Sequence, residues 1–131
     1  MIVLDTHVLI GWVSGAFKLS PRAKRAIDAA VRLGPVMVSA ISVFEIATAV
    51  RRGRLELGFP LEPWLADLGT LPELRFEPVS VEIASLAASF DEAMPGDPAD
   101  RIIAATAIAF QAKLVSADQR LRDVPLVKAV W

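Results

Sequence analysis

Short apolar runs recur along the chain and alternate with longer segments in which apolar residues follow helical spacing. Runs of strand length are expected at residues 1–4, 36–38, 74–79, 114–116 and 126–130. Between them, apolar residues recur every three or four positions, which is typical of amphipathic helices. Helices are therefore expected at residues 6–14, 22–33, 39–52, 60–69, 80–93, 99–112 and 119–122.

Alternation of short buried strands with helices predicts a parallel sheet covered by helices on both faces. We therefore expect an α/β fold with three layers, and residues 1–131 are expected to form a single domain. In such sheets, functional sites gather beyond the carboxyl ends of the strands. Asp5 and Asp118 each follow an expected strand and so fall at that edge.

The composition is that of a folded chain. Hydrophobic residues make up 54% of the sequence and charged residues 22%, which excludes a disordered polypeptide. No segment reaches the roughly 18 uncharged apolar residues that a membrane-spanning helix needs. The apolar start lacks a basic leader and contains Asp5 and His7, unlike a secretory signal peptide. We expect a cytoplasmic protein that does not associate with membranes.

Several carboxylates stand beside strongly apolar segments. Asp5 closes the first expected strand, Glu45 lies within an apolar helix, Asp100 opens the most apolar helix, and Asp118 follows another strand. An ionised carboxylate near a core costs free energy unless a cation or a hydrogen-bond donor compensates it. The simplest compensator that all of them could share is a divalent cation.

Helix capping is the alternative explanation for these acids. Asp5 and Asp118 can each cap the helix that follows, and Asp118 can also pair with Arg122 four positions on. Taken singly, capping explains both residues.

Asp97 and Asp100 belong to one helix start. Asp97 is a good N-cap that can also pair with Arg101, and Asp100 lies at the third helical position, where a carboxylate can reach back to the cap. Glu45 has no such explanation, because the residues three and four positions away include no Lys or Arg. The alternative is a solvated surface Glu, but its apolar flanks disfavour that, so Glu45 is the least easily explained acid of the set.

The near absence of nitrogen and sulfur ligands limits which metal the chain could bind. It has no cysteine and a single histidine, His7, which excludes disulfides and any zinc site built on Cys or several His. Oxygen ligands favour Mg²⁺ or Mn²⁺ over softer ions. The net charge is −1, but basic residues gather in the first half, which permits a basic surface beside an acidic pocket.

The segments Ile2-Val-Leu-Asp5-Thr6, Ser42-Val-Phe-Glu45-Ile46, Asp97-Pro-Ala-Asp100-Arg-Ile-Ile-Ala-Ala-Thr106-Ala107 and Leu114-Val-Ser116-Ala-Asp118 occur in this order. The ordered set resembles PIN-domain nucleases, specifically the VapC-type toxins of type II toxin–antitoxin systems, over essentially the whole chain. Gly96 stands where members of this subgroup often have His, and residues 54–73 match none of the motifs.

The resemblance implies a PIN-like fold and a Mg²⁺-dependent endoribonuclease, with Mn²⁺ as the alternative ion. It implies that Thr6 and Ser116 are supporting hydroxyls, and that Asp5 and Asp100 are the principal metal ligands. It also implies a cognate antitoxin that blocks the pocket, an RNA substrate and a homodimer. The acidic quartet that the resemblance places in the catalytic site is Asp5, Glu45, Asp100 and Asp118.

RNA contacts are expected on the basic residues that follow Glu45 in its helix. Arg51, Arg52 and Arg54 are placed to engage the phosphate backbone near the pocket. The alternative is a solvated helix end favoured by the helix dipole.

Other functions fit less well. A haloacid-dehalogenase-like phosphatase needs Asp where this chain has His7, and a receiver domain needs paired acids after its first strand. The remaining alternative is a catalytically inactive PIN-like interaction module whose acids are caps. Apolar residues would then form either a partner groove or the core; the candidates are Trp12, Phe17, Val43, Phe44 and Trp64.

Overall fold

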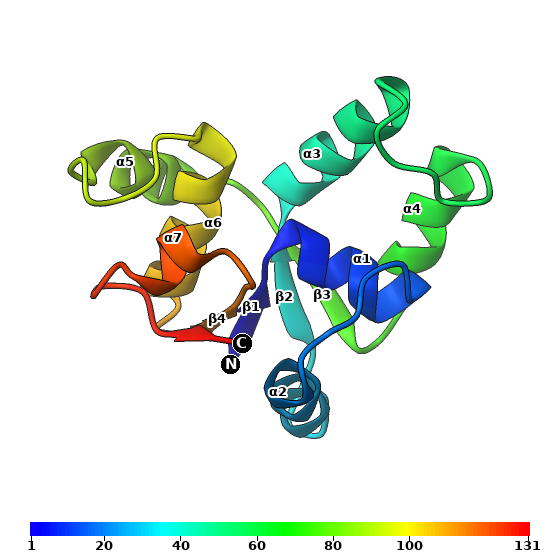
Figure 1. Cartoon of the computed structure of the whole chain (residues 1–131), viewed down its shortest axis with the longest axis horizontal. Coiled ribbons are helices and arrows are strands. Elements are labelled where there is room, and N and C mark those ends of the chain that lie inside the picture. Colours follow the sequence, from blue (N-terminus) through cyan, green and yellow to red (C-terminus); the bar gives the residue numbers. More distant parts are fainter.

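The computed structural model describes residues 1–131 and contains a five-stranded sheet between helices (Figure 1). The strands are β1 (Ile2–Leu4), β2 (Val36–Ser39), β3 (Leu74–Glu77), β4 (Lys113–Val115) and β5 (Ala129–Val130). The helices are α1 (Thr6–Ser14), α2 (Pro21–Val31), α3 (Ala40–Arg51), α4 (Leu61–Gly69), α5 (Val81–Ser89), α6 (Pro98–Ala109) and α7 (Gln119–Arg122). The predicted α/β fold is confirmed.

The first strand lies at the centre of the sheet. The strand order is β3-β2-β1-β4-β5, and every pairing is parallel. Leu4 at the end of β1 lies opposite Val38 of β2 and Val115 of β4. The carboxyl ends of these three strands therefore meet at one edge, and Asp5 and Ser116 follow directly.

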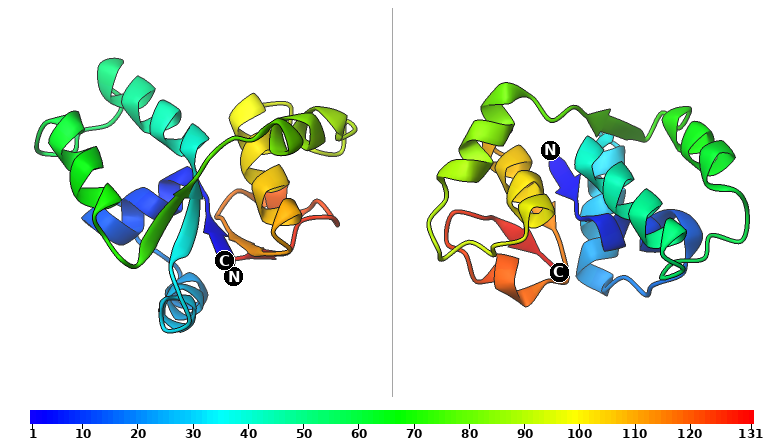
Figure 2. Two further views of the ribbon diagram at one scale, coloured as in Figure 1. Left: turned by 180° about the vertical axis from the view of Figure 1, so that it is seen from behind. Right: turned by 90° about the horizontal axis from the view of Figure 1, so that it is seen from above.

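Alternating strand residues divide the core into two parts. Leu4 packs with residues of α1, α2 and α4, including Ile27 and Trp64. Val3 points to the other face and packs with Ile103 of α6. Figure 2 shows the corresponding groups of helices on opposite sides of the sheet, with α5, α6 and α7 together on one side. The three-layer arrangement follows from this alternation, because both faces of the sheet are apolar.

Several expected elements were too long, including the helix expected at 99–112, which ends at Ala109, and the strand expected at 74–79, which ends at Glu77. The helix predicted at residues 80–93 ends at Ser89, because Phe90 is extended and the Asp91 carboxylate accepts a hydrogen bond from the Ala93 amide. The strand predicted at 126–130 is reduced to Ala129–Val130. None of the helices is long and apolar enough to cross a membrane.

The candidate apolar surface residues divide between core and surface. Trp64 is buried at 4% exposure and belongs to the core. Phe44 on α3 and Phe17 in the α1–α2 connection remain exposed, at 67% and 46%. Trp12 and Val43 are partly buried. Of the five candidates, therefore, only Phe17 and Phe44 have exposed rings.

Candidate active site

The acidic quartet predicted from the sequence lines one cleft. The cleft has a volume of about 310 Å³ and lies at the carboxyl edge of the central strands. Each acid belongs to a different helix: Asp5 and Asp118 precede α1 and α7, Glu45 lies within α3, and Asp100 lies in the first turn of α6. Its polar lining consists of Asp5, Thr6, His7, Glu45, Arg54, Asp100 and Asp118, and its apolar lining includes Ile10, Phe17, Ile46, Ala49 and Leu55.

Asp5 is the most buried of these acids, at 4% exposure. It caps α1, and its Oδ1 accepts a hydrogen bond of 2.8 Å from the Thr6 amide. Its Oδ2 accepts a hydrogen bond of 2.6 Å from the Ser116 hydroxyl, which is itself fully buried. Ser116 also accepts from the Asp118 amide at 3.0 Å, so a single hydroxyl orients two of the acidic residues.

Glu45 is held from another helix rather than by its own neighbours. The Thr6 hydroxyl donates to Oε1 of Glu45 at 2.5 Å and lies 2.8 Å from the hydroxyl of buried Ser42. Burial raises the pKa of Glu45, the Thr6 hydrogen bond opposes that rise, and the charges of Asp5 and Asp97 add to it. Ser42 was not predicted as part of the site, although it precedes Glu45 by one turn on α3.

Asp100 and Asp118 share a cation that the sequence analysis missed. The Arg120 guanidinium lies 3.1 Å from Oδ2 of Asp100 and 2.7 Å from Oδ2 of Asp118. Burial raises the pKa of Asp100 to about 6, with further contributions from Asp5 and Asp97, and Arg120 opposes the rise. The hydrogen bond from Arg120 lowers the pKa of Asp118.

Two ion pairs predicted from sequence spacing, Asp118 with Arg122 and Asp97 with Arg101, do not form. Asp118 caps α7 as predicted, but its carboxylate pairs with Arg120 and not with Arg122. Asp97 caps α6 as predicted, but Arg101 turns away and donates to the carbonyls of Ala87, Phe90 and Pro95.

Asp100 does not complete a capping box. Its amide donates to the Asp97 carboxylate at 3.3 Å, while its own carboxylate binds Arg120. The Asp100 carboxylate is therefore directed to the cleft rather than back to its helix cap.

His7 is a further site residue that was not predicted from the sequence. Its Nε2 accepts a hydrogen bond of 3.0 Å from the Ala117 amide, which requires that Nε2 carry no proton. Its Nδ1 lies 3.7 Å from Oδ2 of Asp5, and its ring meets Trp131 edge-on. His7 therefore ties the start of α1 to the segment after β4.

The basic residues predicted to contact RNA do not share one environment. Gly53, at a φ of 71°, reverses the chain after α3, and the Arg54 amide donates to the Ala49 carbonyl at 2.8 Å. This turn places Arg54 in the lining of the acidic cleft. Arg51 and Arg52 are exposed and do not line it.

The donor set fits a hard divalent cation in its chemistry. Most of the ligands near Asp5 are carboxylate or hydroxyl oxygens, which suit Mg²⁺ or Mn²⁺, and His7 adds a ring nitrogen, Nδ1, 3.7 Å from Oδ2 of Asp5. Burial is the main cause of the raised pKa values of Glu45 and Asp100, and the negative charges of Asp5 and Asp97 add to both. No three Asp, Glu or His side chains converge on one point, however, and Arg120 supplies the shared positive charge.

The family of the chain follows from comparison with known proteins. The PIN domain family model matches residues 2–126, so the chain belongs to the PIN-domain family. Within that family it is a VapC-type member. It is 38% identical over 132 residues to Ribonuclease VapC22 of Mycobacterium tuberculosis, covering 99% of this chain and 98% of the relative.

Solved structures support the same fold. VapBC2 from Rickettsia felis, bound to a DNA fragment from its promoter, aligns with a TM-score of 0.71 and 16% identity, over 98% of this chain and 97% of that chain. A toxin–antitoxin complex from Klebsiella pneumoniae aligns with a TM-score of 0.66 and 20% identity, over 97% and 95%. FitAcB from Neisseria gonorrhoeae aligns with a TM-score of 0.63 and 25% identity, over 91% and 88%.

Proposed function

We propose that this protein is a Mg²⁺-dependent endoribonuclease and the toxin of a type II toxin–antitoxin system. The observation that carries the proposal is that Asp5, Glu45, Asp100 and Asp118 line one cleft. A VapC-type relative of nearly equal length is named a ribonuclease, and that supports the choice of RNA. Mn²⁺ is the alternative ion for the same oxygen ligands.

Asp5 and Asp100 are proposed to hold the ion. Bound Mg²⁺ supplies positive charge to the scissile phosphate and lowers the pKa of the attacking water. Ser116 would keep Oδ2 of Asp5 in place for the ion, and Asp100 would exchange its contact with Arg120 for one with the ion. Binding of the ion would therefore change only the partners of the Asp5 and Asp100 carboxylate oxygens.

Glu45 or Asp118 is proposed to orient or deprotonate the attacking water. The Thr6 hydroxyl fixes Oε1 of Glu45, which leaves the other oxygen to orient the nucleophile or accept its proton. Burial raises the pKa of Glu45, which makes it a better proton acceptor than an ordinary Glu. Attack by water, rather than by the ribose 2′-hydroxyl, would leave a 5′-phosphate and a 3′-hydroxyl.

The test is RNA cleavage by an Asp5→Asn variant. Asn keeps the size of Asp5 but removes the charge, so Mg²⁺-dependent cleavage should fall by at least about 100-fold while the fold persists. Asp67→Asn, at an exposed position on α4 outside the cleft, is the matched control. Full activity in Asp5→Asn would refute the assignment. An intact wild type without metal-dependent cleavage would instead favour the inactive interaction module.

A cognate antitoxin and a homodimer complete the proposal. The similar solved structures include toxin–antitoxin complexes, which supports a protein inhibitor for this chain. Expression of the wild type should arrest growth, and co-expression of the adjacent antitoxin gene should restore it. Asp5→Asn should be harmless in the same host. The dimer is tested by light scattering of the purified chain.

A further inference from the structure

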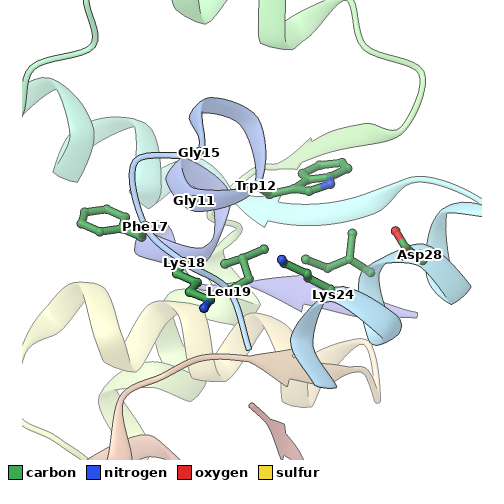
Figure 3. A pocket seen from close by; sticks show the side chains of 9 residues that line it. Gly11, Trp12, Gly15, Phe17, Lys18, Leu19, Lys24 and Asp28 are labelled. Atoms are coloured by element: carbon green, nitrogen blue, oxygen red, sulfur yellow. The ribbon is translucent and has the colours of Figure 1, made fainter. Parts of the chain in front are cut away.

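A second cavity adjoins the acidic cleft and shares one wall with it. It has a volume of about 460 Å³ and lies between α1, α2 and the connection that joins them (Figure 3). Phe17 of that connection lines both the cavity and the acidic cleft. Lys18 and Lys24 line the second cavity, and Asp28 is its only acid. The charge therefore changes sign across Phe17.

The connection is positioned by close packing against α1. A Cβ at Gly11 would lie 2.9 Å from Leu19 Cδ2 and 3.0 Å from the Phe17 carbonyl oxygen, so only Gly permits this approach. Leu19 is buried, whereas Phe17 remains 46% exposed. Figure 3 shows the Phe17 ring extending from the connection on the side away from Trp12 and α2. The ring is thus held at the surface by a fixed backbone.

An acidic site that cleaves a polyanion needs positive charge beside it. The cleft contains four carboxylates, and Arg54 and Arg120 are the cations in or against it. Arg120 is already paired with Asp100 and Asp118. The ammonium groups of Lys18 and Lys24 make no hydrogen bond or salt bridge within the chain and are exposed, so both are available to phosphate. Exposed aromatic rings beside cations are the usual components of single-strand binding surfaces.

We propose that Phe17, Lys18 and Lys24 form a subsite for single-stranded RNA next to the acidic cleft. A base adjacent to the scissile phosphate stacks on Phe17, and the neighbouring phosphate binds Lys18 and Lys24. Stacking accepts any base, so this subsite adds affinity and strand position without reading sequence. The inference rests on the proposed ribonuclease function and extends it to residues outside the acidic quartet.

The test measures RNA binding in an Asp118→Asn background, so that cleavage does not consume the probe. The probe is a short, fluorescently labelled single-stranded RNA of mixed sequence, followed by anisotropy with Mg²⁺ present. Phe17→Ala should weaken binding between about 5-fold and 100-fold. The double variant Lys18→Ala/Lys24→Ala should lower the slope of log affinity against log salt by about 1.4.

Matched controls lie elsewhere on the surface. Phe59→Ala removes another exposed ring, and Lys113→Ala/Lys128→Ala removes two exposed lysines that line neither cavity. These variants should bind RNA as the background does. Thermal unfolding checks that each variant is folded. If Phe17→Ala does not fold, the double variant Lys18→Ala/Lys24→Ala still tests the subsite.

The outcomes separate this inference from the function itself. If the wild type cleaves RNA and the Phe17 and lysine variants bind as tightly as the controls, the subsite is refuted and this surface is left for a protein partner. If the background protein binds no RNA and the wild type cleaves none, the proposed function fails, and the subsite fails with it. Selective loss of binding in the Phe17 and lysine variants supports the subsite.

Discussion

Ser116 donates a hydrogen bond of 2.6 Å to Oδ2 of Asp5 across 111 positions of sequence. The pairing of β1 with β4 brings the two residues together, because Leu4 and Val115, which precede them, are partners in the sheet. Both side chains are buried, so neither can exchange this bond for one to water. The hydroxyl therefore compensates a carboxylate at the edge of the core.

Ser116→Ala should destabilise the protein by about 1.5–3 kcal/mol, the range for a lost hydrogen bond to a charged group. It also removes the acceptor of the Asp118 amide, so the metal affinity of the site should fall. Urea unfolding and isothermal titration with Mg²⁺ measure the two effects. Ser85→Ala, at an exposed position on α5, is the control. A stability equal to that of this control would contradict the role given to Ser116.

Asp100 should make the stability of the metal-free protein depend on pH. Its pKa is about 6 in the folded chain against an ordinary value of 3.8, so the folded state binds more protons between these values. Stability should therefore fall as the pH rises through this window and level off above about pH 6. Burial raises the pKa of Glu45 as well, which acts in the same direction.

Thermal unfolding in EDTA across this pH range tests the expectation. Asp100→Asn should flatten the profile, whereas Asp67→Asn should leave it unchanged. A wild-type profile that rises between about pH 4 and pH 6 would show that another group dominates, since the sign is fixed by the raised pKa of Asp100.

Metal should reverse the order of stability between the wild type and Asp100→Asn. At neutral pH without metal, the substitution removes a repelling charge, so the variant should be at least as stable as the wild type. Saturating Mg²⁺ should stabilise the wild type by about 2.7 kcal/mol at 100 times its dissociation constant. The variant should gain much less. Differential scanning calorimetry with Mg²⁺, Mn²⁺ and EDTA measures this difference, and an equal gain in both proteins would exclude Asp100 as a ligand.

The sheet was predictable because its strands are short apolar runs bounded by turn or helix-start residues. Val36 to Val38 follows Gly34-Pro35, and Ser39 caps the next helix, so both ends are marked. The end of α5 was not predictable from spacing. Phe90 and Ala93 continue the helical pattern, and only the turn at Asp91 ends the helix earlier.

Part of the site could be predicted for the same reason. Asp5 and Asp118 follow strands, so their place at the sheet edge depends only on strand assignment. The partner of Asp118 was predicted wrongly. A pair between Asp118 and Arg122, four positions apart, assumes that both residues are helical. Asp118 is a cap in extended conformation, and its carboxylate folds back onto the first turn, where it meets Arg120.

The hydrogen-bond partners of Arg101 and His7 depend on the tertiary structure. Arg101 donates to the carbonyls of Ala87 and Phe90 at the end of α5, where helix carbonyls lack partners of their own. His7 binds the Ala117 amide only because β1 and β4 are in register. Sequence spacing contains neither relationship.

Arg54 should contribute more to RNA binding than Arg51 or Arg52, because only Arg54 lines the acidic cleft. Arg54→Ala should raise the Michaelis constant for RNA and lower the salt slope of binding by about 0.7, the value for one phosphate contact on a single strand. Arg51→Ala, at the end of the same helix, is the matched control. Equal effects of the two substitutions would favour a diffuse basic surface over a defined contact.

Arg120 should compete with the metal for Asp100 and Asp118. Its guanidinium binds both carboxylates, so Arg120→Gln should lower the melting temperature of the metal-free protein, because the acids then repel one another without compensation. The same substitution frees these oxygens, so Mg²⁺ should bind more tightly and raise the melting temperature by more than it does in the wild type. Arg122→Gln, at an exposed position on the same helix, should change neither quantity.

Calorimetric titration with Mg²⁺ in Arg120→Gln and Arg122→Gln decides whether this competition exists. Weaker Mg²⁺ binding in Arg120→Gln would show that the guanidinium helps to hold the carboxylates in a metal-ready arrangement. Tighter binding would show that Arg120 is displaced when the metal binds, since one positive group then replaces another at the same oxygens.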